Sequence, residues 1–333
     1  MGGFWLGKYN HYFLTTNNSS IITSSYISTT IATTQPKNDK LTFTFAGDAM
    51  FGREIGYQFQ NDFSKLFENF GDRVFWGTDI AYLNLEGPIS DKTVIQQRRP
   101  DNLVFNFSRE TIDALKYLHI NTVGLANNHT YNQGKTGFEI TQKILEAAGI
   151  KYFGSPIENN DASIARFENN SIKISLIAIN ALTTTSGVEK LVQEEKAEDR
   201  FVIVLPHWGN EYQTTHSQNQ ENLAKSWIEA GADLIIGAHP HVIQDAQIID
   251  EKPVFYSLGN FVFDQTFSQN TQQGLILSGE ITRDKLTIIP IPIESKNLKP
   301  ELLQGEEKQK IINTLCQNIL EFCNNNRIEL TLL

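Results

Sequence analysis

LTFTFAGD, residues 41–48, is a short apolar run that ends at a potential metal ligand, Asp48, and four later runs also end at potential ligands. Such runs lack polar alternation and predict strands that are buried on both faces of a helix-covered sheet. The four later runs are IAYLNLE (80–86), TVGLANNH (122–129), FVIVLPH (201–207) and DLIIGAHPH (233–241). In such sheets ligands bind beyond the carboxyl ends of the strands. These ends carry Asp, Glu, Asn and His, which suit borderline divalent metals, so the five runs predict a metal site.

The composition is that of an ordinary globular protein, with 40% apolar and 20% charged residues in a chain of 333. The formal net charge of −10 is not offset by a basic cluster. This argues against a nucleic-acid partner and against attraction to anionic lipid.

The first 40 residues differ from the rest. Residues 4–14 (FWLGKYNHYFL) are rich in aromatic side chains, but they fall short of the roughly 20 apolar residues of a spanning helix. A Ser/Thr-rich stretch follows, with the composition of a solvated linker. We expect a disordered tail over residues 1–40; the alternative is the remnant of a membrane anchor.

Strand and helix signals alternate from residue 41, and further helices are expected at 189–200 and 219–230. The later apolar segments follow one another without long helices, which predicts a second, more antiparallel sheet. Together these patterns predict an α/β fold of two packed sheets with helices outside, forming one domain over residues 41–293.

A polar linker and a helix near 306–323 are expected in the last segment, residues 294–333. Cys316 and Cys323 would then lie two helical turns apart, roughly 10 Å at about 1.5 Å per residue. That separation is too large for a disulfide within a helix, so we expect buried or inert thiols.

The motifs at the predicted strand ends are GD (47–48), NLEG (84–87), NNH (127–129), HWG (207–209), GAHPH (237–241) and SLGNF (257–261). In this order and spacing the sequence resembles the CapA-like proteins of capsule and poly-γ-glutamate synthesis, within the calcineurin-like metallophosphoesterase superfamily. The resemblance covers roughly residues 41–265. It implies a metallophosphoesterase-like, four-layer sandwich of two mixed β-sheets flanked by helices.

The resemblance also implies a site for one or two divalent ions (Mn, Zn or Fe). The metal ligands that it implies are Asp48, Glu86, Asn128, His207, His239 and His241. Asp48 can bridge two metals, and His129 faces the substrate, so both are candidate catalytic residues. The superfamily has Asp-x-His in its first motif, whereas this chain has Met50 in place of the His. This departure and the extra methylene of Glu86 weaken one metal position.

Four further residues are candidates for substrate binding: Arg53, Asn127, Glu211 and Asn260. Arg53 suits an anionic group, or equally a salt bridge. Asn260 either binds a ligand or holds a turn, and Asn127 has the same two interpretations. Glu211 follows the HWGN segment and could line the pocket.

The leading hypothesis is a metal-dependent hydrolase that cleaves a phosphoester, or an amide in an anionic polymer, during capsule or polymer synthesis. It implies an extracytoplasmic, membrane-associated place in the cell envelope, with polymer synthase subunits as further partners. One alternative is a membrane-tethered, non-catalytic accessory subunit that keeps its metal for structure. Another is a cytosolic phosphoesterase, so a cytoplasmic location stays open.

Overall fold

A computed structural model describes residues 39–59, 61–90, 103–169 and 171–332. Apart from residues 39 and 40, the predicted N-terminal tail lies outside these ranges. Within them, none of the helices combines the length and the apolar character that crossing a bilayer requires.

The larger sheet has ten strands in the order β15-β16-β13-β12-β1-β2-β3-β4, with β11 beside β1 and β14 beside β13. Strands β1 to β4 are parallel, while β12, β13 and β16 are antiparallel to their neighbours. The strands are β1 (Lys40–Ala49), β2 (Ile80–Leu85), β3 (Thr122–Gly124), β4 (Lys151–Phe153), β11 (Asn260–Val262), β12 (Gln273–Thr282), β13 (Lys285–Lys296), β14 (Lys299–Leu302), β15 (Cys323–Asn324) and β16 (Arg327–Thr331).

The smaller sheet has six strands in the order β5-β6-β7-β8-β10-β9. Its four inner strands are parallel, and the edge strands β5 and β9 are antiparallel. The strands are β5 (Ile164–Asn169), β6 (Ile172–Asn180), β7 (Phe201–His207), β8 (Leu234–Ile236), β9 (Ala246–Ile249) and β10 (Lys252–Phe255).

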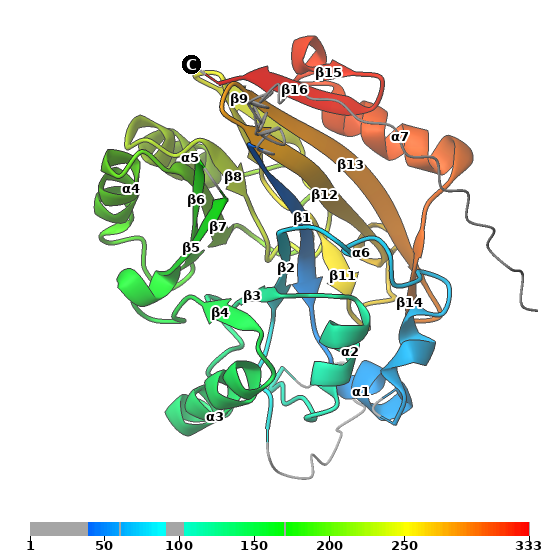
Figure 1. Ribbon diagram of the computed structural model, residues 1–333. Coiled ribbons are helices and arrows are strands. Elements are labelled where there is room, and N and C mark those ends of the chain that lie inside the picture. Colours follow the sequence, from blue (N-terminus) through cyan, green and yellow to red (C-terminus); the bar gives the residue numbers. More distant parts are fainter. Residues whose placement is uncertain (1–38, 60, 91–102, 170, 333) are drawn as a thin grey trace, which may run out of the picture. The chain divides into compact units, whose positions relative to one another are not determined.

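Helices cover the outer faces of the two sheets (Figure 1). They are α1 (Arg53–Phe59), α2 (Thr111–Tyr117) and α3 (Gly134–Ala147) on the larger sheet, and α4 (Val188–Ala197) and α5 (Gln218–Glu229) on the smaller one. α7 (Gly305–Cys316) runs along β13, α6 (Gln269–Gln272) precedes β12, and three 3-10 helices lie in the connections: η1 (Phe63–Phe67), η2 (Asp161–Ser163) and η3 (Leu320–Phe322). The predicted fold class of two mixed sheets between helical layers is confirmed.

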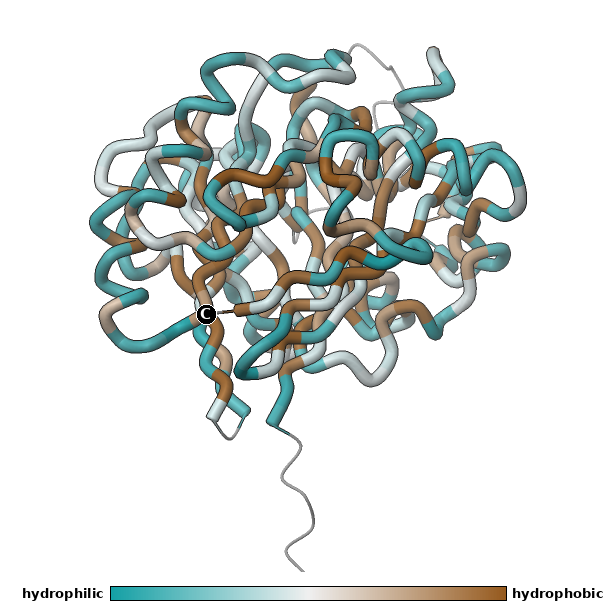
Figure 2. The backbone as a smooth tube through the Cα atoms, turned by 90° about the horizontal axis from the view of Figure 1, so that it is seen from above, coloured by the Kyte–Doolittle hydropathy of each residue, from teal (hydrophilic) through white to brown (hydrophobic). Residues whose placement is uncertain are grey.

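Strand β2 shows why these runs carry no polar alternation. Ala81 and Leu83 face the helices of the outer layer, whereas Ile80 and Tyr82 face the smaller sheet. Both faces of the strand are therefore buried, as successive side chains point to opposite sides. Figure 2 shows hydrophobic residues along these inner strands and hydrophilic residues on the peripheral helices and turns.

The prediction that the later strands form a separate second sheet is wrong. β9 and β10 extend the smaller sheet beside β8, whereas β12 and β13 return to the larger sheet, where β12 pairs with β1. β1 offers an open edge next to the parallel strands, and a late antiparallel strand covers it. Local composition marks a strand but does not specify its partner.

The last segment also differs from the prediction. β13 runs to Lys296, past the expected boundary at residue 293, and β14, β15 and β16 add to the same sheet. α7 ends at Cys316, and η3 then turns the chain so that Cys316 and Cys323 form a disulfide across a Cα–Cα distance of 5.8 Å. The expectation of inert thiols is wrong because it assumed one continuous helix.

Candidate metal centre

The predicted ligands converge on Asp48, which lies in β1 and is fully buried. Its Oδ1 is 3.9 Å from His207 Nδ1, and its Oδ2 is 3.5 Å from His241 Nδ1. The backbone N–H of His239 donates to Oδ2 at 3.0 Å. Burial raises the pKa of Asp48 to about 6, although hydrogen bonds from Asn84 and His239 oppose this. The ends of strands from both sheets thus meet at one carboxylate.

Glu86 follows β2, and its carboxylate has unfavourable surroundings when no cation is bound. Its side chain is fully buried, and neither carboxylate oxygen has a hydrogen-bond partner among the described residues. Oε1 lies 3.7 Å from His241 Nε2 and 3.8 Å from His129 Nε2. Burial, followed by the charge of Asp48, raises the pKa of Glu86 well above its usual value. A buried carboxylate without donors is costly, and a bound cation would remove that cost.

His207 ends β7 and lies beside the exposed Asn128, which follows β3. Its Nε2 is 2.9 Å from Asn128 Oδ1, and its Nδ1 is 3.2 Å from Asn84 Nδ2. Burial, with His239 and His241 adding to it, holds the pKa of His207 well below its usual value. The ring therefore stays neutral, which is the form that binds a metal.

His239 and His241 follow β8 in a strained turn. Their φ angles are 97° and 59°, a region that non-glycine residues adopt at a cost and that is found at functional sites. His239 is buried, and its Nδ1 has no partner among the described residues. Burial lowers the pKa of His239 to about 4 and that of His241 to about 3. Two neutral imidazoles thus face the buried carboxylates.

Asn260, a candidate for substrate binding, instead contacts a predicted ligand. Its Oδ1 is 3.0 Å from His241 Nδ1, and its amide donates to Gln265 Oε1 and to the carbonyl of Thr271. Nδ1–H of His241 donates to this oxygen, which leaves Nε2 directed towards Glu86. Partners of this kind fix the ring orientation of metal-binding histidines.

His129 lies at the edge of the same cluster. Its Nδ1 is 2.9 Å from Asn132 Oδ1, which also accepts the N–H of Phe105, and its ring stacks on Phe105 with centroids 4.0 Å apart. The oxygen of Asn132 is an acceptor, so Nδ1 donates and Nε2 faces Glu86. Burial is the main cause that lowers the pKa of His129.

Arg53 and Asn127 are held by the protein itself. Arg53 is buried, forms an ion pair with Asp264 and lies 5.1 Å from the centre of the Phe105 ring. Asn127 donates to Asn84 and to the carbonyl of Leu85, and accepts from the His129 N–H. The amide of Asn127 thus positions the turn that carries Asn128 and His129.

Glu211 is exposed and lies at the rim of the centre. Its carboxylate and the imidazoles of His239 and His241 offer ligand atoms within 4.8 Å of one another. Asp48, Glu86 and His241 form a second group of this kind. Met50, by contrast, is buried, and its sulfur lies 3.0 Å from the Gly52 N–H.

Asn84 is the functional residue that the sequence motifs did not identify. Its amide donates to Asp48 Oδ1 at 2.7 Å and lies 3.2 Å from His207 Nδ1, while its oxygen accepts from Asn127. The signal was present in the NLEG motif. Asn84 and Glu86 are two residues apart, which places them on the same side of a strand.

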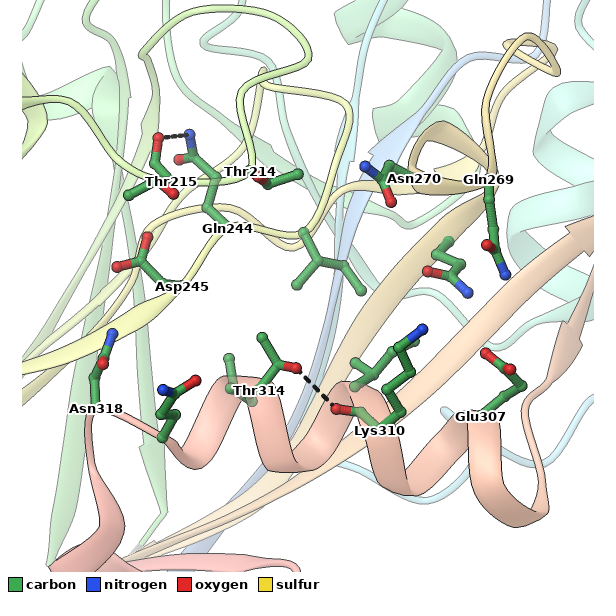
Figure 3. A pocket seen from close by; sticks show the side chains of 15 residues that line it. Thr214, Thr215, Gln244, Asp245, Gln269, Asn270, Glu307, Lys310, Thr314 and Asn318 are labelled. Carbon is green, nitrogen blue, oxygen red and sulfur yellow. Dashed lines mark hydrogen bonds between the residues drawn. The ribbon is translucent and has the colours of Figure 1, made fainter.

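A separate cavity of about 440 Å³ lies between α7, the loop at Thr214–Thr215 and the segment around α6 (Figure 3). Amide and hydroxyl side chains dominate its lining, and Ile243 contributes an apolar part. Asp245 on its wall pairs with His216 at 2.9 Å. None of the predicted metal ligands lines this cavity.

Comparisons with known proteins agree with the motifs. Residues 42–265 match the family "Bacterial capsule synthesis protein PGA_cap". "Capsule biosynthesis protein CapA" of Bacillus anthracis is 29% identical over 317 residues, which cover 85% of this chain and 74% of that protein. "PGA biosynthesis protein CapA" of Bacillus subtilis (strain 168) is 26% identical over 303 residues, 84% of this chain and 79% of that protein.

Among solved structures, a Vps29 single mutant from Entamoeba histolytica aligns with 66% of this chain and 97% of its own, at 14% identity and a TM-score of 0.30. That likeness is too weak to add to the fold described above. The family match spans more than half of the chain and includes every predicted metal ligand. The chain therefore belongs to the PGA_cap family of bacterial capsule synthesis proteins.

Proposed function

We propose that this protein is a metal-dependent hydrolase that serves the synthesis or remodelling of a capsule or of poly-γ-glutamate. Its substrate would be a phosphoester, or an amide bond in an anionic polymer. One observation supports the proposal above the others: the fully buried Glu86 carboxylate has no hydrogen-bond partner in the part of the chain that the structure describes, and it lies beside Asp48 and His241. Such a set of carboxylates and neutral imidazoles is the chemistry of a site for Mn²⁺, Zn²⁺ or iron.

One or two ions would be held by Asp48, Glu86, Asn128, His207, His239 and His241. A bound divalent ion polarises the bond under attack and makes a water molecule more acidic. Side chains of the protein then orient the substrate and exchange protons with it. Nε2 of His129 is held at the site by the contact of Nδ1 with Asn132, and it is positioned to exchange a proton with a reacting group.

The proposed polymer substrate and cellular location are inferred from the relatives. Both CapA proteins are named for the biosynthesis of capsule or PGA, which supports a role in the cell envelope. The disulfide between Cys316 and Cys323 supports an oxidising, extracytoplasmic compartment, because such bonds are rare in the cytosol. Polymer synthase subunits are the partners that this role would require.

The test combines metal analysis with turnover. Purified protein is assayed for bound metal, and then for hydrolysis of a generic phosphodiester and of poly-γ-glutamate. We expect stoichiometric metal and metal-dependent cleavage of one of the two substrates. His129→Ala should keep the metal and lose most of the turnover. Bound metal with no cleavage of either substrate would contradict the hydrolase and leave a binding role in polymer synthesis.

A further inference from the structure

We propose that Glu211 is a metal ligand, and that with His239 it forms a second coordination position beside the one made by Asp48, Glu86 and His241. This inference rests on the proposed metal binding and deepens it. The sequence placed Glu211 among the substrate contacts, and the geometry assigns it a different role.

The ligand atoms of Glu211, His239 and His241 lie almost close enough together to bind one ion. A carboxylate oxygen of Glu211 and one nitrogen from each imidazole lie within 4.8 Å of one another. Bonds to oxygen and nitrogen ligands are about 2.0–2.2 Å long, so two ligands of one ion lie at most about 4.4 Å apart. Glu211 is exposed, and a small rotation of its side chain covers the difference.

An independent observation comes from His239. Its side chain is only 6% exposed, and its Nδ1 has no hydrogen-bond partner among the residues that the structure describes. Unpaired buried ring nitrogens are unfavourable unless something binds them. Its backbone N–H already serves Asp48, and its ring lies 4.7 Å from that of His207. The ring of His239, with its unpaired nitrogen, and the carboxylate of Glu211 thus belong to the same small cluster.

The backbone holds the two loops together. The N–H of Tyr212 donates to the carbonyl of Pro240 at 2.8 Å, and the N–H of Trp208 donates to that of Ala238 at 3.1 Å. These bonds join the loop after β7 to the His-Pro-His turn on both sides of Glu211. Tyr212 also has a positive φ of 63°. Strain of this kind persists where the surroundings fix the conformation, commonly at a functional site.

The negative charge of Glu211 favours a role as a metal ligand over a role in substrate binding. The proposed substrates are anionic, and a bare carboxylate at the rim would repel them. Asp48 and Glu86 already place two buried carboxylates beside His241. A third carboxylate in the cluster is therefore unfavourable in the absence of cations and favourable with two divalent ions, whose four positive charges exceed the three negative ones.

The test is a titration of metal-free protein with Mn²⁺, followed by calorimetry and by the Mn²⁺ electron paramagnetic resonance signal. Wild type, Glu211→Gln and Glu221→Gln are compared. Glu221 is a matched control, since it lies outside the cluster and pairs with Lys225 at 2.6 Å. We expect Glu211→Gln to lose one ion, or to bind it at least about tenfold more weakly, with a changed signal. The control should titrate as wild type does.

Equal stoichiometry, affinity and signal in Glu211→Gln and wild type would overturn this inference while leaving the proposed function intact. A wild type that binds no ion would overturn both. Thermal unfolding of the metal-free forms excludes a folding defect: because Glu211 is exposed and its charge is unfavourable without cations, the variant should unfold at the temperature of wild type or slightly above it.

Discussion

Replacing Glu86 with glutamine should stabilise the metal-free protein while weakening its metal binding. Both carboxylate oxygens are buried and lack a hydrogen-bond partner among the described residues. Burial, ahead of the Asp48 charge, raises the pKa of Glu86 well above 4.5. An unsatisfied buried polar group costs about 1–3 kcal/mol, and a charged one costs more. A neutral amide avoids only the charge part, which amounts to about 1.4 kcal/mol for each tenfold shift of the ionisation equilibrium. We therefore expect the free energy of unfolding of metal-free Glu86→Gln to exceed that of wild type by about 1 kcal/mol or more at pH 8.

The raised pKa of Glu86 also predicts how the stability difference between Glu86→Gln and wild type changes with pH. A carboxyl with a raised pKa binds its proton more readily in the folded than in the unfolded protein. Its contribution to stability is therefore fully present below about pH 4.5 and is lost as the pH rises through the folded-state value. The advantage of Glu86→Gln should be large at pH 8 and should shrink as the pH falls.

Urea unfolding with a chelator, at several pH values, measures this difference. Adding Mn²⁺ should reverse the order, because an ion at 100 times its dissociation constant stabilises the native state by about 2.7 kcal/mol. Glu221→Gln serves as the control and should match wild type throughout. A metal-free Glu86→Gln that is less stable than wild type at pH 8 would refute the view that this carboxylate is held for a cation.

Three other changes test the packing of the fold and the positioning of a metal ligand. Glu195→Gln removes a buried charge that faces two guanidinium groups; we expect a loss of about 3 kcal/mol in urea unfolding. Burial alone would raise the pKa of Glu195, but these partners lower it overall, so its contribution is present above about pH 4.5 and the loss should fade below that value. Asn260→Ala frees the ring of His241 and should weaken Mn²⁺ binding by about 10- to 100-fold in calorimetry; unchanged affinity would count against a positioning role. Replacing Cys316 and Cys323 together by serine should cost about 2–3 kcal/mol, measured against oxidised wild type.

Much of the site could be predicted because of a simple geometric rule. Parallel strands place their carboxyl ends at one edge of a sheet, so ligands at the carboxyl ends of β1, β2 and β3 had to lie near one another. The apolar runs identified these strands, and the polar residue at each end identified the ligands. The meeting of Asp48 with His207 was harder to predict, since β1 and β7 belong to different sheets.

Other features depend on contacts that no local pattern encodes. The return of β12 to the edge of β1 is a long-range pairing, and the disulfide depends on where α7 ends. Asn84 was missed because an Asn inside an apolar strand resembles a tolerated polar residue, and its contacts lie on other strands. Glu211 was noticed, but its role depends on the backbone bonds that join its loop to the His-Pro-His turn.

The centre gathers features that oppose folding when no ion is bound. Asp48 and Glu86 are buried with raised pKa values, and the neighbouring histidines are buried with lowered ones. Two histidines also hold a strained backbone. These unfavourable features do not improve the packing of the core. A bound divalent cation would relieve the electrostatic cost, because it attracts carboxylates and binds neutral imidazoles. The stability that these groups cost the metal-free protein is therefore explained by a site built to bind a metal. For this reason Glu86→Gln should stabilise the metal-free form and destabilise the metal-bound form relative to wild type.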